Sequence, residues 1–168
     1  MSGDFDYDEV MDVIEKYFGD MQPNKDLQMM DFEAEPEITA PVEREVMGLE
    51  SENVTMAWRL PGATSDEALM LEVVDAIMNN GKAGIIDLNL LQEQKLLSAY
   101  SFPYAMADYT SYILQGTPKE GQDLDEVRAM MLAQVDSLRQ GKWDESLLAA
   151  GIANYKLQMQ KMLEDNES

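Results

Sequence analysis

The residues best suited to chemistry near the start of the chain are carboxylates. Five of them are spaced like the oxygen ligands of an EF-hand calcium loop: Asp4, Asp6, Asp8, Asp12 and Glu15. However, Glu9 stands where that loop needs glycine, and no helix can precede a loop that begins at residue 4. Acidic residues also favour the first turn of a helix. We therefore prefer an ordinary helix start and keep a calcium-dependent interaction module as an alternative.

The residue types that the sequence lacks exclude several kinds of chemistry. The 168-residue chain has no His and no Cys, which removes imidazole bases, thiol nucleophiles, disulfides and zinc sites built from those side chains. The loop Gly81-Lys82-Ala83-Gly84 lacks the spacing of a phosphate-binding loop and indicates an ordinary turn. Among 33 acids, chance pairs are everywhere, so no acid–base couple can be nominated.

Charge narrows the choice of partners. The formal net charge is −21, and such a surface repels nucleic-acid phosphates and anionic lipid headgroups. Apolar runs are only a few residues long, and the first residues show no basic segment followed by an apolar one. We therefore expect neither a nucleic-acid nor a membrane partner, and we expect no export signal.

Hydrophobic spacing predicts the elements that must position any site. A helix is expected over Asp8–Phe18, followed by a proline-containing acidic connector. Arg44–Glu50 and Val54–Leu60 then fit the two strands of a hairpin. A capping box at Thr64-Ser65-Asp66-Glu67 predicts the start of the next helix, and a short helix is expected around Ile86–Gln94.

The second half of the body repeats this plan. Ser98–Met106 and Ser111–Gly116 predict another hairpin, and helices are expected to start at Asp123 and Asp144. Hairpins followed by paired helices favour an α+β two-layer sandwich, with a mainly antiparallel sheet and the helices on one face. The expected boundaries are 1–20 for the first helix, 21–43 for the linker, 44–163 for one domain and 164–168 for a frayed tail.

One strand stands out as a candidate binding element. The run Ser98–Tyr104 mixes small and aromatic side chains, and Pro103 cannot donate to a neighbouring strand, which favours an edge position. An open edge can accept an extended peptide by backbone pairing. The candidate peptide-binding residues are Ser98, Ala99, Tyr100, Ser101 and Phe102. A plain sheet strand closed by a turn is the alternative.

Several segments, taken in order, resemble the pitrilysin/insulinase family of zinc metallopeptidases. The segments are Gly3–Asp20 with its Glu-Lys-Tyr-Phe-Gly motif, Asn53–Gly62, Ala76–Gly81, Leu88–Tyr100 and Leu138–Glu145. The resemblance implies a metallohydrolase-like α+β domain of the type also found in mitochondrial processing peptidase. The family's His-x-x-Glu-His zinc motif has no counterpart here, because the chain has no histidine. Many members also place an arginine seven residues before a tyrosine to help bind substrate, whereas Glu93 precedes Tyr100.

The resemblance therefore implies the second, non-catalytic domain of a zinc peptidase, with the first helix continuing from a missing upstream domain. The domain would enclose and dock peptides. If acids line the inner wall of that enclosure, the net charge of −21 would concentrate cationic peptides there. Zn²⁺ would belong to the missing catalytic domain of the same polypeptide, so this chain would need no cofactor and would hydrolyse nothing alone. We expect a bacterial parent, cytoplasmic or periplasmic, and a homodimer of this piece through the N-terminal helix and linker. The alternatives are an assembly subunit without peptidase activity and a free-standing acidic interaction module.

Overall fold

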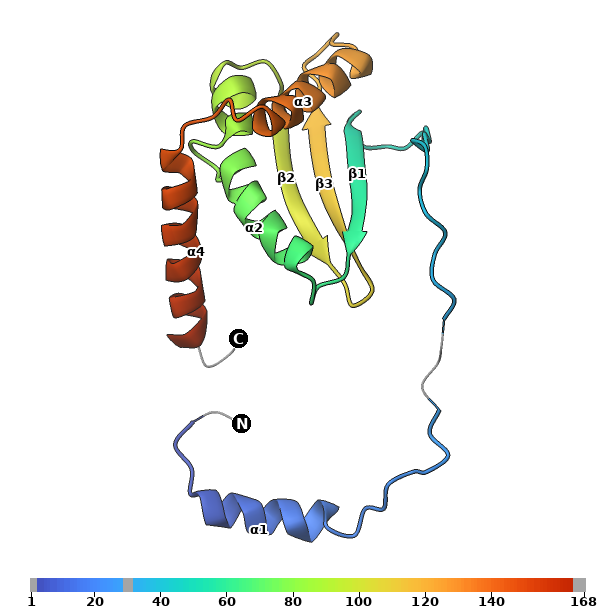
Figure 1. Cartoon of the computed structure of the whole chain (residues 1–168), viewed down its shortest axis with the longest axis vertical. Coiled ribbons are helices and arrows are strands. Elements are labelled where there is room, and N and C mark those ends of the chain that lie inside the picture. The colour runs from blue at the N-terminus through green and yellow to red at the C-terminus, as the bar shows by residue number, and fades with distance from the viewer. Residues whose placement is uncertain (1–2, 29–31, 165–168) are drawn as a thin grey trace. The chain divides into compact units, whose positions relative to one another are not determined.

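The computed structural model describes residues 3–28 and 32–164. The chain divides into two compact units, Met1–Pro41 with Lys161–Ser168, and Val42–Gln160. The elements in chain order are α1 (Tyr7–Phe18), β1 (Val54–Pro61), α2 (Asp66–Met78), the π-type helix η1 (Asp87–Gln92), β2 (Ser98–Ala105), β3 (Tyr109–Thr117), α3 (Leu124–Arg139) and α4 (Ser146–Glu164) (Figure 1). Residues 165–168, most of the predicted tail, lie outside the described part.

In the first unit, α1 is an amphipathic helix. Asp6 caps α1, because its Oδ1 accepts hydrogen bonds from the N–H groups of Asp8 (2.9 Å) and Glu9 (3.1 Å). None of the helix residues is buried. Between α1 and β1, the described residues form no further helix or strand.

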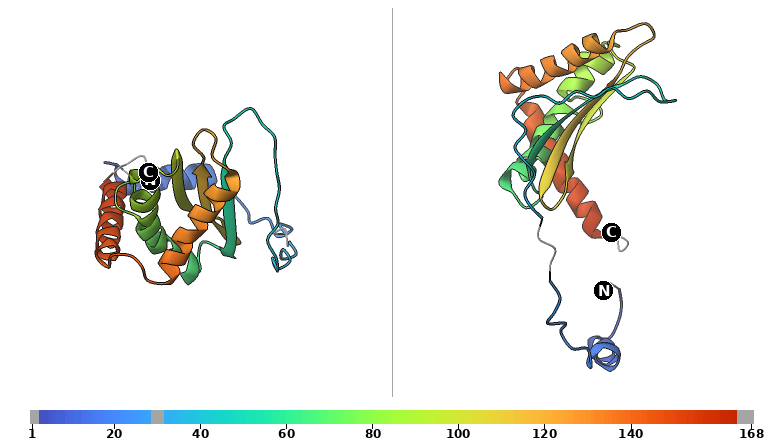
Figure 2. Two further views of the ribbon diagram at one scale, coloured as in Figure 1. Left: turned by 90° about the horizontal axis from the view of Figure 1, so that it is seen from above. Right: turned by 90° about the vertical axis from the view of Figure 1, so that its right-hand side faces the viewer.

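The second unit is built on a three-stranded antiparallel sheet with strand order β1-β3-β2. The register pairs Trp58 of β1 with Tyr112 of the central strand, and Ser101 of β2 with Leu114. The helices of this unit lie on one side of the sheet (Figure 2). The predicted α+β class, an antiparallel sheet backed by helices, is confirmed.

The core lies between the sheet and the helices. The side chains that are buried almost completely come from most of these elements: Met78, Ile86, Leu90, Leu114, Val127 and Met131. Helix α3 approaches β3 closely at Gly116, where an added Cβ would lie 2.8 Å from a methyl group of Val127. Any larger residue at Gly116 would therefore push the two layers apart.

The prediction of a first hairpin is wrong, because one of its two expected strands does not form. Residues 44–50 form no strand, so β1 pairs with β3 and not with its upstream neighbour. The exposed fractions of Val46, Met47 and Leu49 are 87%, 89% and 106%. These apolar residues would point to both sides of a strand, and no layer covers them, so pairing would bury little.

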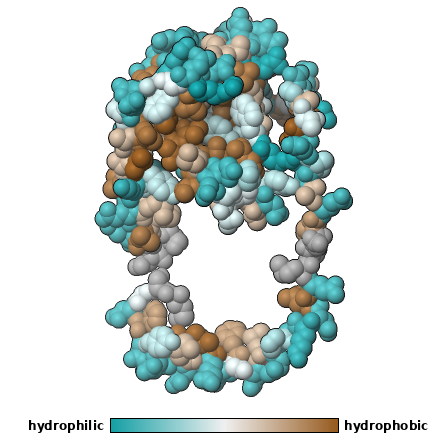
Figure 3. Space-filling view, in the orientation of Figure 1, coloured by the Kyte–Doolittle hydropathy of each residue, from teal (hydrophilic) through white to brown (hydrophobic). Residues whose placement is uncertain are grey.

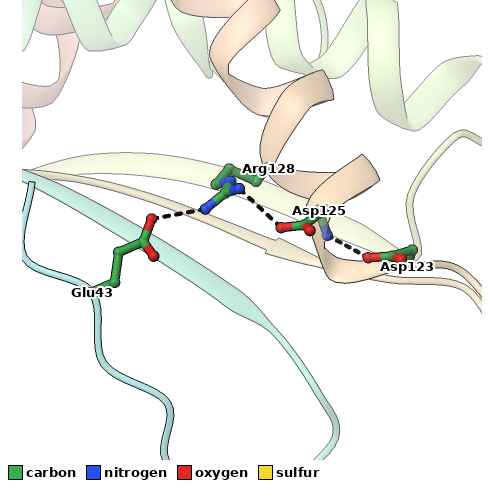
Figure 4. A network of polar contacts seen from close by, with 4 residues as sticks. All are labelled: Glu43, Asp123, Asp125 and Arg128. Atoms are coloured by element: carbon green, nitrogen blue, oxygen red, sulfur yellow. Dashed lines mark hydrogen bonds and ion pairs between the residues drawn. The ribbon is translucent and has the colours of Figure 1, made fainter.

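An ion-pair network attaches the end of the connector to α3 (Figure 4). Glu43 lies 3.0 Å from Arg128, which also contacts Asp125 at 3.0 Å. Asp123 caps the helix by accepting from the N–H of Asp125 at 2.7 Å. Because Glu43 is largely exposed, this pair adds at most about 1 kcal/mol.

None of the helices within residues 3–28 and 32–164 combines the length and the hydrophobicity that a membrane-spanning helix requires.

Candidate functional site

The hairpin of β2 and β3 divides its side chains between two environments. On β3, Thr110, Tyr112 and Leu114 are buried beneath the helices, and the residues between them are half-buried on the opposite side. The register extends this division across the sheet. We call the side away from the helices the open face. Its residues are Thr55, Ala57, Arg59, Pro61, Ser98, Tyr100, Phe102, Tyr104, Tyr109, Ser111, Ile113, Gln115 and Thr117.

The open face is aromatic and free of acids. The rings of Tyr100 and Phe102 stack with centroids 6.1 Å apart, and each residue is 37% exposed. The guanidinium of Arg59 lies 4.9 Å from the ring centroid of Tyr109, a cation–π contact. None of the open-face residues is Asp or Glu, although the chain has 33 acids. This face therefore offers aromatic area, hydroxyl groups and one positive charge.

The five predicted binding residues do not share one environment. Ser98, Tyr100 and Phe102 belong to the open face, whereas Ala99 (4% exposed) and Ser101 (3% exposed) are buried on the helix side. Strand β2 does lie at an edge of the sheet. Peptide binding by these residues stays a prediction.

The directions of the backbone N–H and C=O groups show which positions on the β2 edge could pair with an added strand. The N–H of Met106 donates to the carbonyl of Tyr109 over 3.0 Å, and antiparallel pairs alternate along the strands. The backbone groups of Tyr100 and Phe102 therefore point toward β3, and those of Ala99, Ser101 and Pro103 point away. The Asn79 side chain donates to the outward carbonyl of Ser101 at 3.2 Å. Pro103 has no N–H to offer. An added strand would thus have to displace Asn79.

A buried polar cluster below β2 fixes the hairpin to α2. The side-chain hydroxyls of Ser101 and Tyr112 both donate to Oδ1 of Asp75, the latter over 3.1 Å. Burial raises the pKa of Asp75 to about 6, the two hydrogen bonds partly offset this effect, and Glu72 adds to it. Burial and the neighbouring Asp75 carboxylate also hold the pKa of Tyr112 well above its usual value. Sequence reasoning missed this cluster, although Asp75 sits between Leu71 and Met78 on the buried side of its helix.

The structure accounts for two other sequence patterns without a ligand. In the Gly81–Gly84 loop, Oδ1 of Asn80 accepts from the N–H groups of Lys82, Ala83 and Gly84. The same Gly84 N–H also donates to Asp87 at 3.0 Å. These donors are therefore engaged within the protein rather than turned toward a phosphate.

The acidic residues of the N-terminal pattern likewise belong to a helix and its cap. Since α1 begins at Tyr7, Asp6 acts as its cap, and Asp8, Asp12 and Glu15 lie along the helix instead of wrapping around a loop. Among residues 3–28 and 32–164, no group of three or more acidic, His or Cys residues is placed to hold a metal ion. The donor set also does not fit zinc, because His and Cys are absent from the sequence.

These features define an α+β domain with an aromatic open face. The model of the family described as "Peptidase M16 inactive domain" matches residues 1–155. The chain belongs to this family, which confirms the resemblance to the pitrilysin/insulinase peptidases. The domain is therefore not catalytic by itself.

Two solved structures are similar in fold. A protease from Helicobacter pylori matches with a TM-score of 0.77 and 15% identity, over 98% of this chain and 41% of its own. The inactive peptidase domain of a protein assigned as a zinc protease, from Bordetella parapertussis, matches with a TM-score of 0.61 and 18% identity, over 68% of this chain and 63% of its own. Among curated proteins, none matches the sequence. The chain thus spans less than half of the Helicobacter protein.

Proposed function

We propose that this domain docks extended peptides for a zinc-dependent catalytic domain of the same polypeptide. The observation that carries the proposal is the acid-free open face, on which Tyr100 and Phe102 present stacked, partly exposed rings. Membership of the peptidase family supports a role beside a catalytic domain. Because this chain lacks zinc ligands, the metal and the hydrolytic step would belong to that partner domain.

Side-chain contact on the open face explains docking better than backbone pairing at β2. Asn79 already occupies the Ser101 carbonyl, and Ala99 and Ser101 are buried. Aromatic rings provide apolar area at low cost in conformational entropy, and aromatic pairs add about 0.5–1.5 kcal/mol beyond area burial. Such a face would accept many sequences, as a domain that delivers different peptides requires.

Charge would bias the peptides that arrive. A net charge of −21 attracts cationic chains over distances of about 10 Å at 0.1 M salt. The open face itself has no carboxylate, so the attraction would act on encounter and the rings would hold the bound peptide. We therefore expect basic peptides with aromatic or aliphatic residues to bind best.

Fluorescence anisotropy with two unstructured labelled peptides tests this proposal. The peptides share their apolar positions, and one has Lys where the other has Glu. We expect the basic peptide to bind more tightly at low salt, and we expect Y100A/F102A to weaken its binding at least several-fold. Leu132→Ala is the matched control, because Leu132 lies on α3 and is similarly exposed at 39%. Equal binding by the double variant and the wild-type chain would refute docking on this face.

A further inference from the structure

Helix α4 has an apolar stripe with coiled-coil spacing. Its residues follow one another at intervals of four, three and four: Leu148, Ile152, Tyr155 and Met159. Their exposed fractions are 37%, 41%, 42% and 38%. Positions spaced in this way form the seam of a coiled coil, where each side chain inserts between side chains of a facing helix.

The stripe does not point toward the body of its own domain. The buried residues of α4 are Leu147 and Gly151, and the helix meets α2 at Gly151, where an added Cβ would lie 2.8 Å from the Cβ of Ala76. At about 100° per residue, the stripe is turned roughly a quarter of a turn from that contact. Figure 3 shows hydrophobic residues at the surface over α2 and α4.

A hollow extends the stripe at the start of α4. Its volume is about 440 Å³, and its lining is Gly141, Trp143, Glu145, Leu148, Ala149 and Ile152. Leu148 and Ile152 of the stripe therefore form part of the wall of this hollow. The hollow is large enough to receive a long, unbranched apolar side chain.

Charge favours a second copy at this helix. Two chains of net charge −21 repel each other, yet no acid occurs between Ser146 and Gln160, where the only charged residue is Lys156. Contact over residues 146–160 would therefore bring together two copies with little like-charge opposition, which is confined to Glu145 and Glu164 at the ends of that stretch. The stripe is also self-complementary, because an antiparallel pair places Leu148 opposite the Met159 of the second copy and Ile152 opposite its Tyr155.

We propose that α4 is a homodimer interface, in which two copies pack their stripes antiparallel about a two-fold axis. Met159 of one copy reaches the hollow beside Trp143 of the other, a position suited to a flexible thioether side chain. Four half-exposed side chains per copy form a smaller interface than the usual 800 Å² or so per partner. The dimer is therefore weak, with dissociation constants on the order of 10–100 μM. It strengthens with added salt.

Sedimentation velocity of the full chain tests the proposal from about 10 μM to 1 mM, at low and high salt. We expect the wild-type chain to change from monomer to dimer across this range, and Ile152→Glu to remain a monomer. Leu157→Glu adds the same charge on the opposite side of the same helix, where Leu157 is 50% exposed, and should dimerise like the wild-type chain. A strictly monomeric wild-type chain, or equal behaviour of the two variants, would overturn the interface.

Cysteine crosslinking checks the antiparallel arrangement. The sequence has no Cys, so single cysteines report without background. Mixing Leu148→Cys with Met159→Cys should give a disulfide-linked mixed dimer in preference to either homodimer. Preferred Leu148→Cys homodimers would indicate a parallel arrangement and contradict the proposal. Neither outcome depends on peptide docking, which uses the open face.

Discussion

The phenol of Tyr112 on the central strand donates a hydrogen bond to the carboxylate of Asp75 on α2 over 3.1 Å. This contact, shared with Ser101, connects the helix layer to the two strands that carry the aromatic pair. A carboxylate in this position stabilises the hairpin through its hydrogen bonds and costs free energy through its burial.

The first prediction concerns the pH dependence of stability. The folded pKa of Asp75, about 6, lies above the ordinary aspartate value of 3.8, so the folded state binds the proton more tightly. By linkage, this group's contribution to stability is greatest below pH 4 and is lost as the pH rises through 6. Allowing for its partial exposure, the loss is on the order of 2 kcal/mol.

Asp75→Asn keeps an oxygen acceptor for Ser101 and Tyr112 but does not titrate. We expect the variant to lose less stability than the wild-type chain between pH 4.5 and pH 7.5 in urea unfolding. The other carboxylates are common to both proteins, so the difference between the two curves isolates Asp75. Parallel curves would mean that Asp75 has an ordinary pKa.

The second prediction concerns the approach of α3 to β3. An alanine at Gly116 would place its Cβ 2.8 Å from Val127 and 3.3 Å from Met131. We expect Gly116→Ala to destabilise the domain by about 1–3 kcal/mol through overpacking. Gly48→Ala is the control, because an added Cβ at Gly48 meets nothing within 4 Å. Chemical denaturation gives the free energy of unfolding of both variants, provided that the slope of the transition matches that of the wild-type chain. Similar midpoints for the two variants would contradict the close packing.

The third prediction concerns the loop after α2. Removing the Asn80 side chain leaves three backbone N–H groups of residues 82–84 without that acceptor. We expect Asn80→Ala to cost about 1–3 kcal/mol and to speed hydrogen exchange in this loop. Asn24→Ala removes an exposed contact with the N–H of Asp26 and should change stability by less than about 0.5 kcal/mol. Unchanged exchange at Gly84 would show that this N–H relies on Asp87 alone.

Much of the fold was predictable because its signals are local. Capping signals at Asp6, in the box from Thr64 to Glu67 and at Asp123 mark the starts of three helices, and runs rich in Tyr, Ser and Phe indicate the second hairpin. The strand expected at 44–50 failed because its apolar residues meet no second layer, which a local pattern does not reveal.

The candidate site depends on contacts between distant segments. Asn79 meets the carbonyl of Ser101 only when α2 ends beside β2, a separation of 22 positions in the chain. The burial of Ala99 and Ser101 depends on the same packing. An edge strand could therefore be predicted from Pro103, whereas the occupation of its edge could not.

The occupied edge of β2 also bears on how the domain behaves in concentrated solution. Asn79 and Pro103 deny a neighbouring molecule two of the backbone positions through which fibrillar stacking would propagate. Even where strong salt suppresses the repulsion between highly charged copies, this margin of the sheet should resist growth into amyloid-like ribbons.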